Sequence, residues 1–395
     1  MDPISNPYSP GAGLRPPELA GREADVTSFT TVIARAEAGR PSQSLVLTGL
    51  RGVGKTVLLN ELAQRARKRD WIVAQVEART DSEAAGFGLR AAVARGLNQS
   101  LRYVTGSWGV GERLKAALST FKSFSLRTDP TGGLSLGIDI EAQRGRADSG
   151  SLEIDLSELA FDLGASASDR GTGVAVFIDE MQELDQTELA AICTAVHEAG
   201  QRSIPFYVIG AGLPSLPGVL AEARSYAERL FDFRPIGPLD GPDAKIAVVR
   251  PAELQGVAWE AEAAEAIVEA SAGYPYFVQE FAKATWDYAP GPGVSAADSK
   301  LGIQAGRDKL DAGFFASRWN RATPGERDYL RAMAPDGEGP ALSGEVARRL
   351  GKRSVQQVGP IRARLIHKGL VYAPEHGLVS YTVPGMADFI SRQVD

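Results

Sequence analysis

Apolar residues follow two different spacings along the first half of the chain. Those at 26, 29, 32 and 33 have the spacing of an α-helix. A helical pattern at 56–63 also joins two strand-like runs, and a strand, helix, strand order predicts a parallel sheet. Continuous apolar runs, typical of strands buried on both faces, occur at 44–48, 71–77, 174–178 and 205–209. We therefore predict an α/β fold in which helices sandwich a parallel sheet.

The pattern changes after this predicted core. Between the second and third runs, about residues 120–173, we predict an irregular insertion with a hairpin candidate at 129–133. After Pro235 the apolar spacing is helical, which predicts a helical lid. Near the C-terminus, three helical patterns precede two strand-like runs, an order that suggests a winged helix. The predicted units are a Pro/Gly-rich tail at 1–20, an α/β core at 21–235, the lid at 236–318 and the winged helix at 319–395.

Composition excludes several classes of protein. The 395 residues carry a net charge of −6, which argues against a protein that coats nucleic acid through bulk charge. No stretch approaches the roughly 20 apolar residues of a membrane span, and prolines and glycines stand where a signal peptide needs an apolar core. We therefore expect a cytoplasmic protein. The single cysteine, Cys193, excludes an intramolecular disulfide, and the histidines are not at metal-ligand spacing.

The strongest motif follows the first predicted strand. Residues 49–56, Gly-Leu-Arg-Gly-Val-Gly-Lys-Thr, match the phosphate-binding loop (P-loop) pattern at every position, and a predicted helix follows. The glycines let backbone N–H groups turn towards phosphates, Lys55 reaches the β- and γ-phosphate oxygens, and Thr56 ligates Mg²⁺. We predict that ATP and Mg²⁺ bind here, through Gly49, Arg51, Gly52, Val53, Gly54, Lys55, Thr56 and Val57.

Two carboxylates end the third predicted strand. Asp179 and Glu180 follow a run of apolar residues, and carboxylates at a buried strand end are costly without a cation. We expect Asp179 to hold Mg²⁺, and Glu180 to orient and deprotonate the water that attacks the γ-phosphate. Gln182 is placed to touch the γ-phosphate or this water, and an ordinary surface glutamine is the alternative.

The next predicted strand ends in Gly210–Gly212, where many such ATPases carry a polar residue that senses the γ-phosphate. The polar side chain that senses the γ-phosphate is therefore absent, or a residue elsewhere supplies it. Arg224 and Arg229 follow at the distance of an arginine finger, which acts on the nucleotide of a neighbouring subunit. We choose Arg229 as the catalytic candidate, a role that requires a homo-oligomer. The alternative for these arginines is an ion pair with Glu222 or Glu228.

The motifs resemble those of AAA+ P-loop ATPases of the origin-recognition and cell-division-control (Orc/Cdc6-like) group, bordering the archaeal-type and STAND ATPases. The resemblance implies that Gly21 and Arg22 line the adenine pocket and that Pro275 packs near adenine. Replication initiators carry a nucleotide-sensing arginine where this chain has its Gly-x-Pro turn, which favours a switch-like branch with slow hydrolysis. The segments that carry the resemblance are 19–23 (Leu-Ala-Gly-Arg-Glu), 48–56, 177–180 and 272–277 (Ala-Gly-Tyr-Pro-Tyr-Phe).

Basic residues gather near the C-terminus although the chain is acidic. Between 341 and 370 seven basic residues stand against one acidic residue, Glu345. Arg362 and Arg364, on a predicted helix, have side chains able to reach double-stranded DNA. Two functions fit: an ATP-dependent switch that acts on DNA through the winged helix, or a STAND-like signalling or defence ATPase whose winged helix serves autoinhibition or protein contact. A metabolic kinase is disfavoured because Glu180 indicates water as the phosphoryl acceptor.

Overall fold

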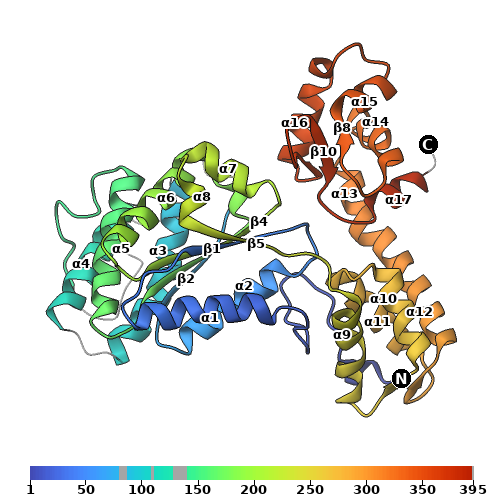
Figure 1. Cartoon of the computed structure of the whole chain (residues 1–395), viewed down its shortest axis with the longest axis horizontal. Coiled ribbons are helices and arrows are strands. Elements are labelled where there is room, and N and C mark those ends of the chain that lie inside the picture. The colour runs from blue at the N-terminus through green and yellow to red at the C-terminus, as the bar shows by residue number, and fades with distance from the viewer. Residues whose placement is uncertain (80–86, 108–110, 128–139, 394–395) are drawn as a thin grey trace.

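A computed structural model describes residues 1–79, 87–107, 111–127 and 140–393 of the chain. It has a core built on a sheet, a helical lid beside the core, and a C-terminal unit that one long helical segment joins to the lid (Figure 1). We use "lid" for residues 236–318 and "C-terminal unit" for residues 319–395. Within the described residues, no helix is both long enough and apolar enough to cross a membrane.

The core sheet has five parallel strands in the order β2-β3-β4-β1-β5. Successive side chains of a strand point to opposite faces, so Leu45 and Leu47 pack against α1 and α2, whereas Val46 packs on the opposite face. The predicted α/β fold with a sandwiched parallel sheet is confirmed. The strands are β1 (Ser44–Thr48), β2 (Ile72–Glu77), β3 (Val174–Asp179), β4 (Phe206–Gly212) and β5 (Phe231–Pro235).

Helices cover both faces of this sheet. The face of α1 (Glu23–Glu37) and α2 (Lys55–Arg67) buries Phe29, Leu58 and Leu62. A larger set of helices covers the other face: α3 (Phe87–Ser107), α4 (Glu112–Leu126), α5 (Leu152–Ser168), α6 (Gln186–Gln201), α7 (Leu216–Ala223) and α8 (Ala227–Leu230). Because the strands are parallel, all five end at the same edge, and this edge carries the P-loop.

Two predictions for the core were wrong. The segment 120–173 is not irregular where it is described, because α5 buries Leu152, Leu156 and Leu159 at helical spacing. The strand β5 was missed because it has only five residues, of which Phe231 alone is buried, and ends in a proline, which is too short a pattern to identify an edge strand. The hairpin candidate at 129–133 lies outside the described residues.

The lid and the C-terminal unit are mostly helical. In the lid, the short strands β6 (Ala258–Trp259) and β7 (Gly293–Val294) pair beside α9 (Gly241–Glu253), α10 (Ala261–Ser271) and α11 (Pro275–Tyr288). Helix α12 (Ala296–Lys309), a π-helical turn η3 (Leu310–Phe315) and α13 (Ala316–Asn320) then run without a break into the C-terminal unit. This unit contains α14 (Pro324–Met333), α15 (Ser343–Arg349), α16 (Gly359–His367), α17 (Met386–Ser391) and an antiparallel sheet of β8 (Ala341–Leu342), β10 (Leu378–Tyr381) and β9 (Val371–Tyr372).

The lid and the C-terminal unit share one hydrophobic core. Phe277 of the lid, Phe315 of η3 and Phe389 of α17 belong to the same buried cluster. The rings of Phe315 and Phe389 are stacked with centroids 5.3 Å apart. Side-chain packing is therefore continuous from the lid, through η3, into the C-terminal unit.

The proline-rich N-terminal segment packs on the lid. The indole N–H of Trp286 donates to the carbonyl oxygen of Asp2 (3.1 Å), and the buried Tyr8 hydroxyl donates to the carbonyl oxygen of Val248. The chain end therefore lies beside the lid helices (Figure 1). From there the chain runs back to α1 and passes the carboxyl edge of the sheet, where residues 9–20 form one wall of a pocket.

Candidate functional site

The P-loop joins β1 to α2 along a path that requires glycine. Gly52 and Gly54 have φ angles of 90° and 92°, which side chains with a Cβ rarely adopt. A Cβ atom on Gly49 would lie 2.1 Å from the carbonyl oxygen of Ile236. Since α2 begins at Lys55, the loop and the free N–H groups of the first helical turn form an anion-binding site.

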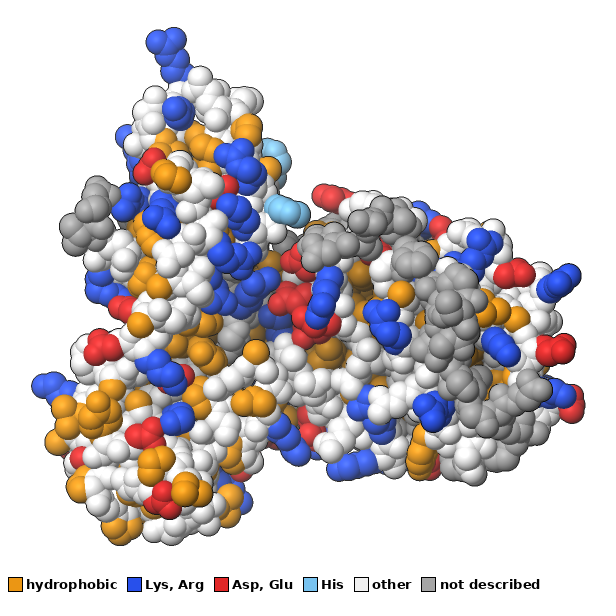
Figure 2. All heavy atoms as spheres, turned by 180° about the vertical axis from the view of Figure 1, so that it is seen from behind, with side chains coloured by type: hydrophobic (Ala, Val, Ile, Leu, Met, Phe, Trp, Pro, Cys, Tyr) orange, Lys and Arg blue, Asp and Glu red, His pale blue; other side chains and the backbone are white. Residues whose placement is uncertain are grey.

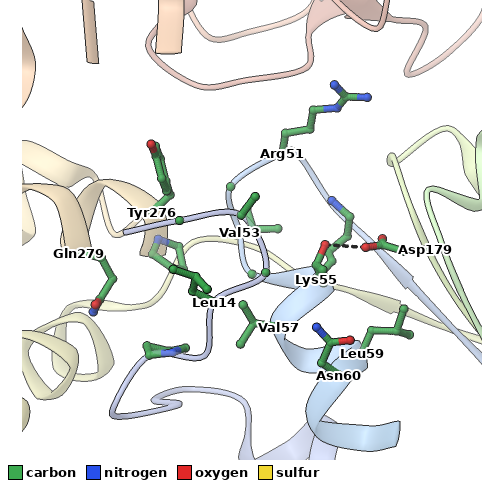
Figure 3. Close-up of a pocket in the computed structure, with 18 of the residues that line it drawn as sticks. Leu14, Arg51, Val53, Lys55, Val57, Leu59, Asn60, Asp179, Tyr276 and Gln279 are labelled. Carbon is green, nitrogen blue, oxygen red and sulfur yellow. Dashed lines mark hydrogen bonds between the residues drawn. The ribbon is translucent and has the colours of Figure 1, made fainter. Parts of the chain in front are cut away.

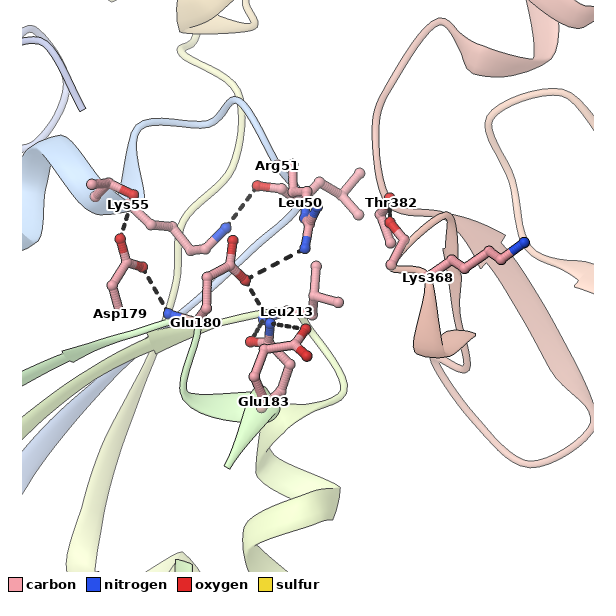
Figure 4. Close-up of polar contacts among 12 residues, drawn as sticks. Leu50, Arg51, Lys55, Asp179, Glu180, Glu183, Leu213, Lys368 and Thr382 are labelled. Atoms are coloured by element: carbon pink, nitrogen blue, oxygen red, sulfur yellow. Dashed lines mark hydrogen bonds and ion pairs between the residues drawn. The ribbon is translucent and has the colours of Figure 1, made fainter. Parts of the chain in front are cut away.

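Lys55 is buried within this loop. Its ammonium group donates to the carbonyl oxygens of Gly49 (2.8 Å) and Leu50 (2.9 Å) (Figure 4). Burial lowers the pKa of Lys55 to about 8, although the charges of Glu180 and Asp179 oppose this shift. The site therefore favours an additional negative charge, because an anion beside Lys55 offsets the cost of its burial.

A hydroxyl and a carboxylate meet next to Lys55. The Thr56 hydroxyl donates to Asp179 Oδ2 (2.6 Å), and burial raises the pKa of Asp179 while this hydrogen bond opposes the rise. Oxygen ligands of this kind suit Mg²⁺, which usually keeps water and phosphate oxygens as further ligands. Among the described residues no group of three His, Cys, Asp or Glu side chains could hold a metal alone. Thr56 and Asp179 therefore fit a magnesium ion that is bound together with a nucleotide.

Glu180 is held in an unusual backbone conformation. Its φ angle is 50°, a strained region for a residue with a side chain, and such strain is concentrated at functional sites. Glu180 Oε2 accepts a hydrogen bond from the Gln182 amide (2.5 Å) and lies 3.8 Å from the Arg51 guanidinium (Figure 4). The carboxylate is therefore fixed beside the P-loop.

Gln182 occupies the space beside Gly212, the glycine that ends β4. Its Oε1 accepts from the backbone N–H of Leu213 (3.0 Å), while its amide binds Glu180. A Cβ on Gly212 would lie 2.5 Å from this Oε1, and one on Gly210 would lie 2.5 Å from Met181 Sδ. The glycines thus make room for Gln182, which is an organised part of the site and not an ordinary surface residue.

A cavity of about 890 Å³ joins these groups to the lid and to the N-terminal segment. This volume is within the range of small-molecule sites. Figure 3 shows Lys55 and Asp179 on one side of Val53 and Val57, with Tyr276 and Gln279 on the other. The predicted residues that line the cavity are Arg22, Arg51, Gly52, Val53, Gly54, Lys55, Thr56, Val57, Asp179, Glu180 and Pro275.

Three predicted site residues do not line the cavity. Gly49 contributes only its carbonyl group to Lys55, and Gly21 lies beside Asp243, where a Cβ would be 2.6 Å from the carboxylate. Arg229 is exposed on α8, away from the P-loop of its own chain, and its carbonyl oxygen accepts from Gln43. The cavity of a single chain is therefore complete without Arg229.

The other predicted arginines have definite partners. Arg22 is buried and donates to the carbonyl oxygens of Val53 (3.0 Å) and Gly237 (2.7 Å), so it ties the P-loop to the start of the lid. Arg224 pairs with Glu153 at 2.8 Å, and not with either of the glutamates near it in sequence. The local sequence around Arg224, at the end of α7, could not identify this partner, because Glu153 belongs to α5.

Part of the cavity wall consists of residues that could not be predicted from the sequence. The N-terminal residues 9–20 lack periodicity, and nothing in their pattern indicates what they contact. Tyr276, Phe314 and Arg318 also line the cavity, from the lid and from the segment that follows it. Aromatic residues at helical spacing predict only a packed face, so these side chains gave no separate signal.

The basic side chains of the C-terminal unit are largely engaged within it. Arg362 donates to the carbonyl oxygen of Leu378 (2.9 Å), and Arg364 and Lys368 pair with Glu326 at 3.2 and 2.6 Å. Although burial opposes it, the hydrogen bonds from Lys368, the Thr323 backbone and Arg364 lower the pKa of Glu326 to about 2. Arg362 and Arg364 therefore already have partners within the chain.

Comparisons with known proteins agree with this architecture. Residues 18–209 match the AAA ATPase domain family, and residues 312–390 match a domain of unknown function, DUF8462. No curated protein gives a match. The Walker-type ATPase PABY2304 of Pyrococcus abyssi is similar over 95% of this chain and 97% of its own, with a TM-score of 0.60 and 15% identity.

An origin-recognition protein is also similar in structure. The ORC2 protein of Aeropyrum pernix, solved in ADPNP and ADP complexes, is similar over 96% of each chain, with a TM-score of 0.52 and 15% identity. At such identities the similarity concerns the fold. The family match over residues 18–209 supports the resemblance to AAA+ ATPases, and the similarity to the origin-recognition protein is one of fold.

Proposed function

We propose that this protein, whose residues 18–209 match the AAA ATPase domain family, binds and slowly hydrolyses Mg²⁺-ATP, and that the nucleotide controls how the C-terminal unit docks on the P-loop. The main support for this proposal is one hydrogen bond between the P-loop and the C-terminal unit. The backbone N–H of Arg51, inside the P-loop, donates to the carbonyl oxygen of Thr382 in the C-terminal unit (3.0 Å). A loop that binds phosphate and also binds another part of the chain is suited to transmit the state of the nucleotide.

The residues of the cavity take separate roles in this proposal. Lys55 and the loop N–H groups bind the β- and γ-phosphates, while Thr56 and Asp179 hold Mg²⁺, which neutralises phosphate charge. Glu180 accepts a proton from the attacking water, and Gln182 keeps its carboxylate in place. Pro275 and the apolar wall fit the adenine, while Arg22 supports the loop beneath it.

Charge complementarity supports docking of the C-terminal unit. Figure 2 shows basic side chains of the C-terminal unit and its connecting helix facing acidic side chains of the core across the hollow between them. Near the P-loop, Glu180 and Glu183 lie on the core side, whereas Lys368 of the C-terminal unit points away from them and pairs with Glu326 (Figure 4). Opposite charges across a contact favour association and fix its orientation.

The contacts of Arg362 and Arg364 favour docking over DNA binding as the main role of the unit. Each would have to exchange an internal partner for a DNA phosphate. Lys352 and Arg353 are exposed and form no ion pair within the described part of the chain, so a DNA partner would meet these two first. Docking on the P-loop needs no such exchange, and we therefore place DNA binding second.

Hydrogen–deuterium exchange tests the switch. Residues 369–383 face the P-loop but do not line the cavity, so their exchange reports docking and not direct contact with nucleotide. We expect a non-hydrolysable ATP analogue to slow exchange in this segment at least about tenfold relative to ADP, because tighter docking suppresses local opening. Helix α5, none of whose residues lines the cavity, is the internal reference. Equal exchange with both nucleotides would rule out the switch.

Two glycines offer a matched pair of variants for this experiment. Gly369 and Gly377 both have positive φ angles, 63° and 81°, so alanine strains both positions. Only at Gly369 would the new Cβ approach the core, 3.1 Å from Arg51 Nη2. Gly369→Ala should therefore reduce the difference between the two nucleotides, whereas Gly377→Ala should keep it. A loss in both variants would indicate general destabilisation of the unit.

Arg229 is proposed as a finger that completes the site of a neighbouring subunit. Its exposure and its distance from the cavity of its own chain are compatible with this role. Arg229→Ala should leave ATP affinity intact and lower turnover by up to roughly 10³-fold. Mixing it with a Glu180→Gln subunit should restore part of the turnover, because one interface then contains both intact residues. Mixed oligomers without recovered turnover would exclude the finger.

A further inference from the structure

Arg318 brings a further arginine to the wall of the cavity. It lies on α13, the short helix that leads from η3 into the C-terminal unit. It lines the same cavity as Lys55, Asp179 and Glu180. No motif of the sequence indicates this position, because Arg318 follows the P-loop by more than half of the chain length.

The guanidinium group of Arg318 has no carboxylate partner. It donates to the carbonyl oxygen of Phe314 (2.7 Å) and stacks on the Phe314 ring, with Cζ 3.9 Å from the centroid. In the parts of the chain that the structure describes, it forms no ion pair. A partly buried cation without a counter-charge is costly, and the cost is removed when an anion binds beside it.

Like charges around Arg318 add to this cost. Burial, followed by the charges of Arg51 and Arg321, lowers the pKa of Arg318 to about 10, so it stays charged at neutral pH. Arg51 in turn lies 3.8 Å from the carboxylate of Glu180, the residue expected to act at the γ-phosphate. Arg318 therefore lines the cavity within reach of the Arg51 charge, and Arg51 in turn borders the carboxylate of Glu180.

We propose that Arg318 binds the terminal phosphate of ATP bound in its own chain. This inference rests on the proposed function. ADP has no phosphate at this position, so Arg318 distinguishes the two nucleotides. The terminal phosphate also brings a negative charge between Arg51 and Arg318, which turns mutual repulsion into attraction to a common anion.

The residues next to Arg318 connect it to both the P-loop and the C-terminal unit. The turn η3 directly precedes α13, and π-helical turns within helices are frequent at functional sites. Its Phe314 ring lies 5.2 Å from Tyr276, whose backbone N–H donates to Gly52 of the P-loop (3.3 Å). On the other side, Phe315 stacks on Phe389 of the C-terminal unit. A shift of Arg318 towards the phosphate therefore moves side chains that contact both the P-loop and the C-terminal unit.

Nucleotide affinity of variants tests this inference. We expect Arg318→Ala to weaken binding of a non-hydrolysable ATP analogue by about 10- to 100-fold, the value of one charge-assisted hydrogen bond, and to leave ADP affinity within about threefold. Arg318→Lys should recover part of the loss, because it restores the charge but not the fork of donors. The control is Arg307→Ala, an exposed arginine of α12 that does not line the cavity and should change neither affinity.

The outcomes separate this inference from the proposed function. Equal losses for both nucleotides in Arg318→Ala would indicate a structural role and overturn the assignment. An unchanged affinity for the ATP analogue would overturn it as well, while the wild-type protein still binds nucleotide. If the wild-type protein binds neither nucleotide, the proposed function fails, and the inference fails with it.

Discussion

Lys55→Ala should lower the affinity for both ATP and ADP by at least about 100-fold, because two lost charge-assisted hydrogen bonds amount to about 3 kcal/mol. The structure shows why Arg22 and Arg51 cannot substitute for it. Lys55 is buried inside the loop, with its ammonium held by the carbonyl groups of Gly49 and Leu50. Arg51 points towards Glu180 and Arg22 is bound to Val53 and Gly237. Fluorescent nucleotide titration measures the loss.

The pKa of Lys55 gives this prediction a second readout. The pKa is about 8 in the free protein, so the ammonium loses its proton as the pH rises from 7 to 9. Phosphate binding requires the charged form, and wild-type affinity should therefore fall by about tenfold over this range. Lys55→Ala should lack this component of the pH dependence.

The exposed Lys68, at the end of α2, offers a control. Lys68→Ala removes a lysine of the same helix outside the cavity and should keep both the affinity and its pH dependence. Wild-type affinity in Lys55→Ala would refute the assignment of the P-loop as the nucleotide site.

Glu180→Gln should keep nucleotide binding and lower ATP turnover by about 10²- to 10⁴-fold, the usual contribution of a general base. Glutamine has the same shape and its carbonyl oxygen still accepts from Gln182, so the strained backbone at position 180 retains its support. The loss of charge opposite Arg51 costs little, because that pair is 3.8 Å apart and partly exposed. Phosphate release at saturating ATP gives the turnover.

Glu183 supplies the matched control for this variant. Its carboxylate is 3.4 Å from the amide of Gln182, and it does not line the cavity. Glu183→Gln removes an equal charge three residues from Glu180 and should leave turnover within about threefold. If Glu180→Gln hydrolyses ATP as fast as the wild type, another group must activate the water.

The local parts of the site could be predicted because each depends on a few neighbouring residues. A strand, a glycine loop and a helix suffice to form the P-loop, and the glycines at 52 and 54 adopt the positive φ angles that the motif requires. Asp179 meets Thr56 because parallel strands end at the same edge of the sheet. Both relations follow from chain order and strand direction.

Helix α5 and strand β5 were not predicted because their residue patterns are compatible with more than one secondary structure. Helix α5 carries apolar residues at helical spacing, but the surrounding turn residues masked that pattern. Strand β5 is too short for its pattern to distinguish it from a loop. Local propensity is a weak signal in such segments, and their packing against the sheet selects the structure.

By itself the sequence determined the fold class, the phosphate loop and the carboxylates that face it, because these depend on residues within one βα unit or on the order of units. Only the tertiary structure decided which long side chains reach the site. Arg318 enters the cavity, Arg224 binds Glu153, and Arg364 binds Glu326. An arginine side chain spans several ångströms and binds whichever carboxylate or carbonyl group the packed helices bring near it, and that neighbour is set by packing and not by local sequence.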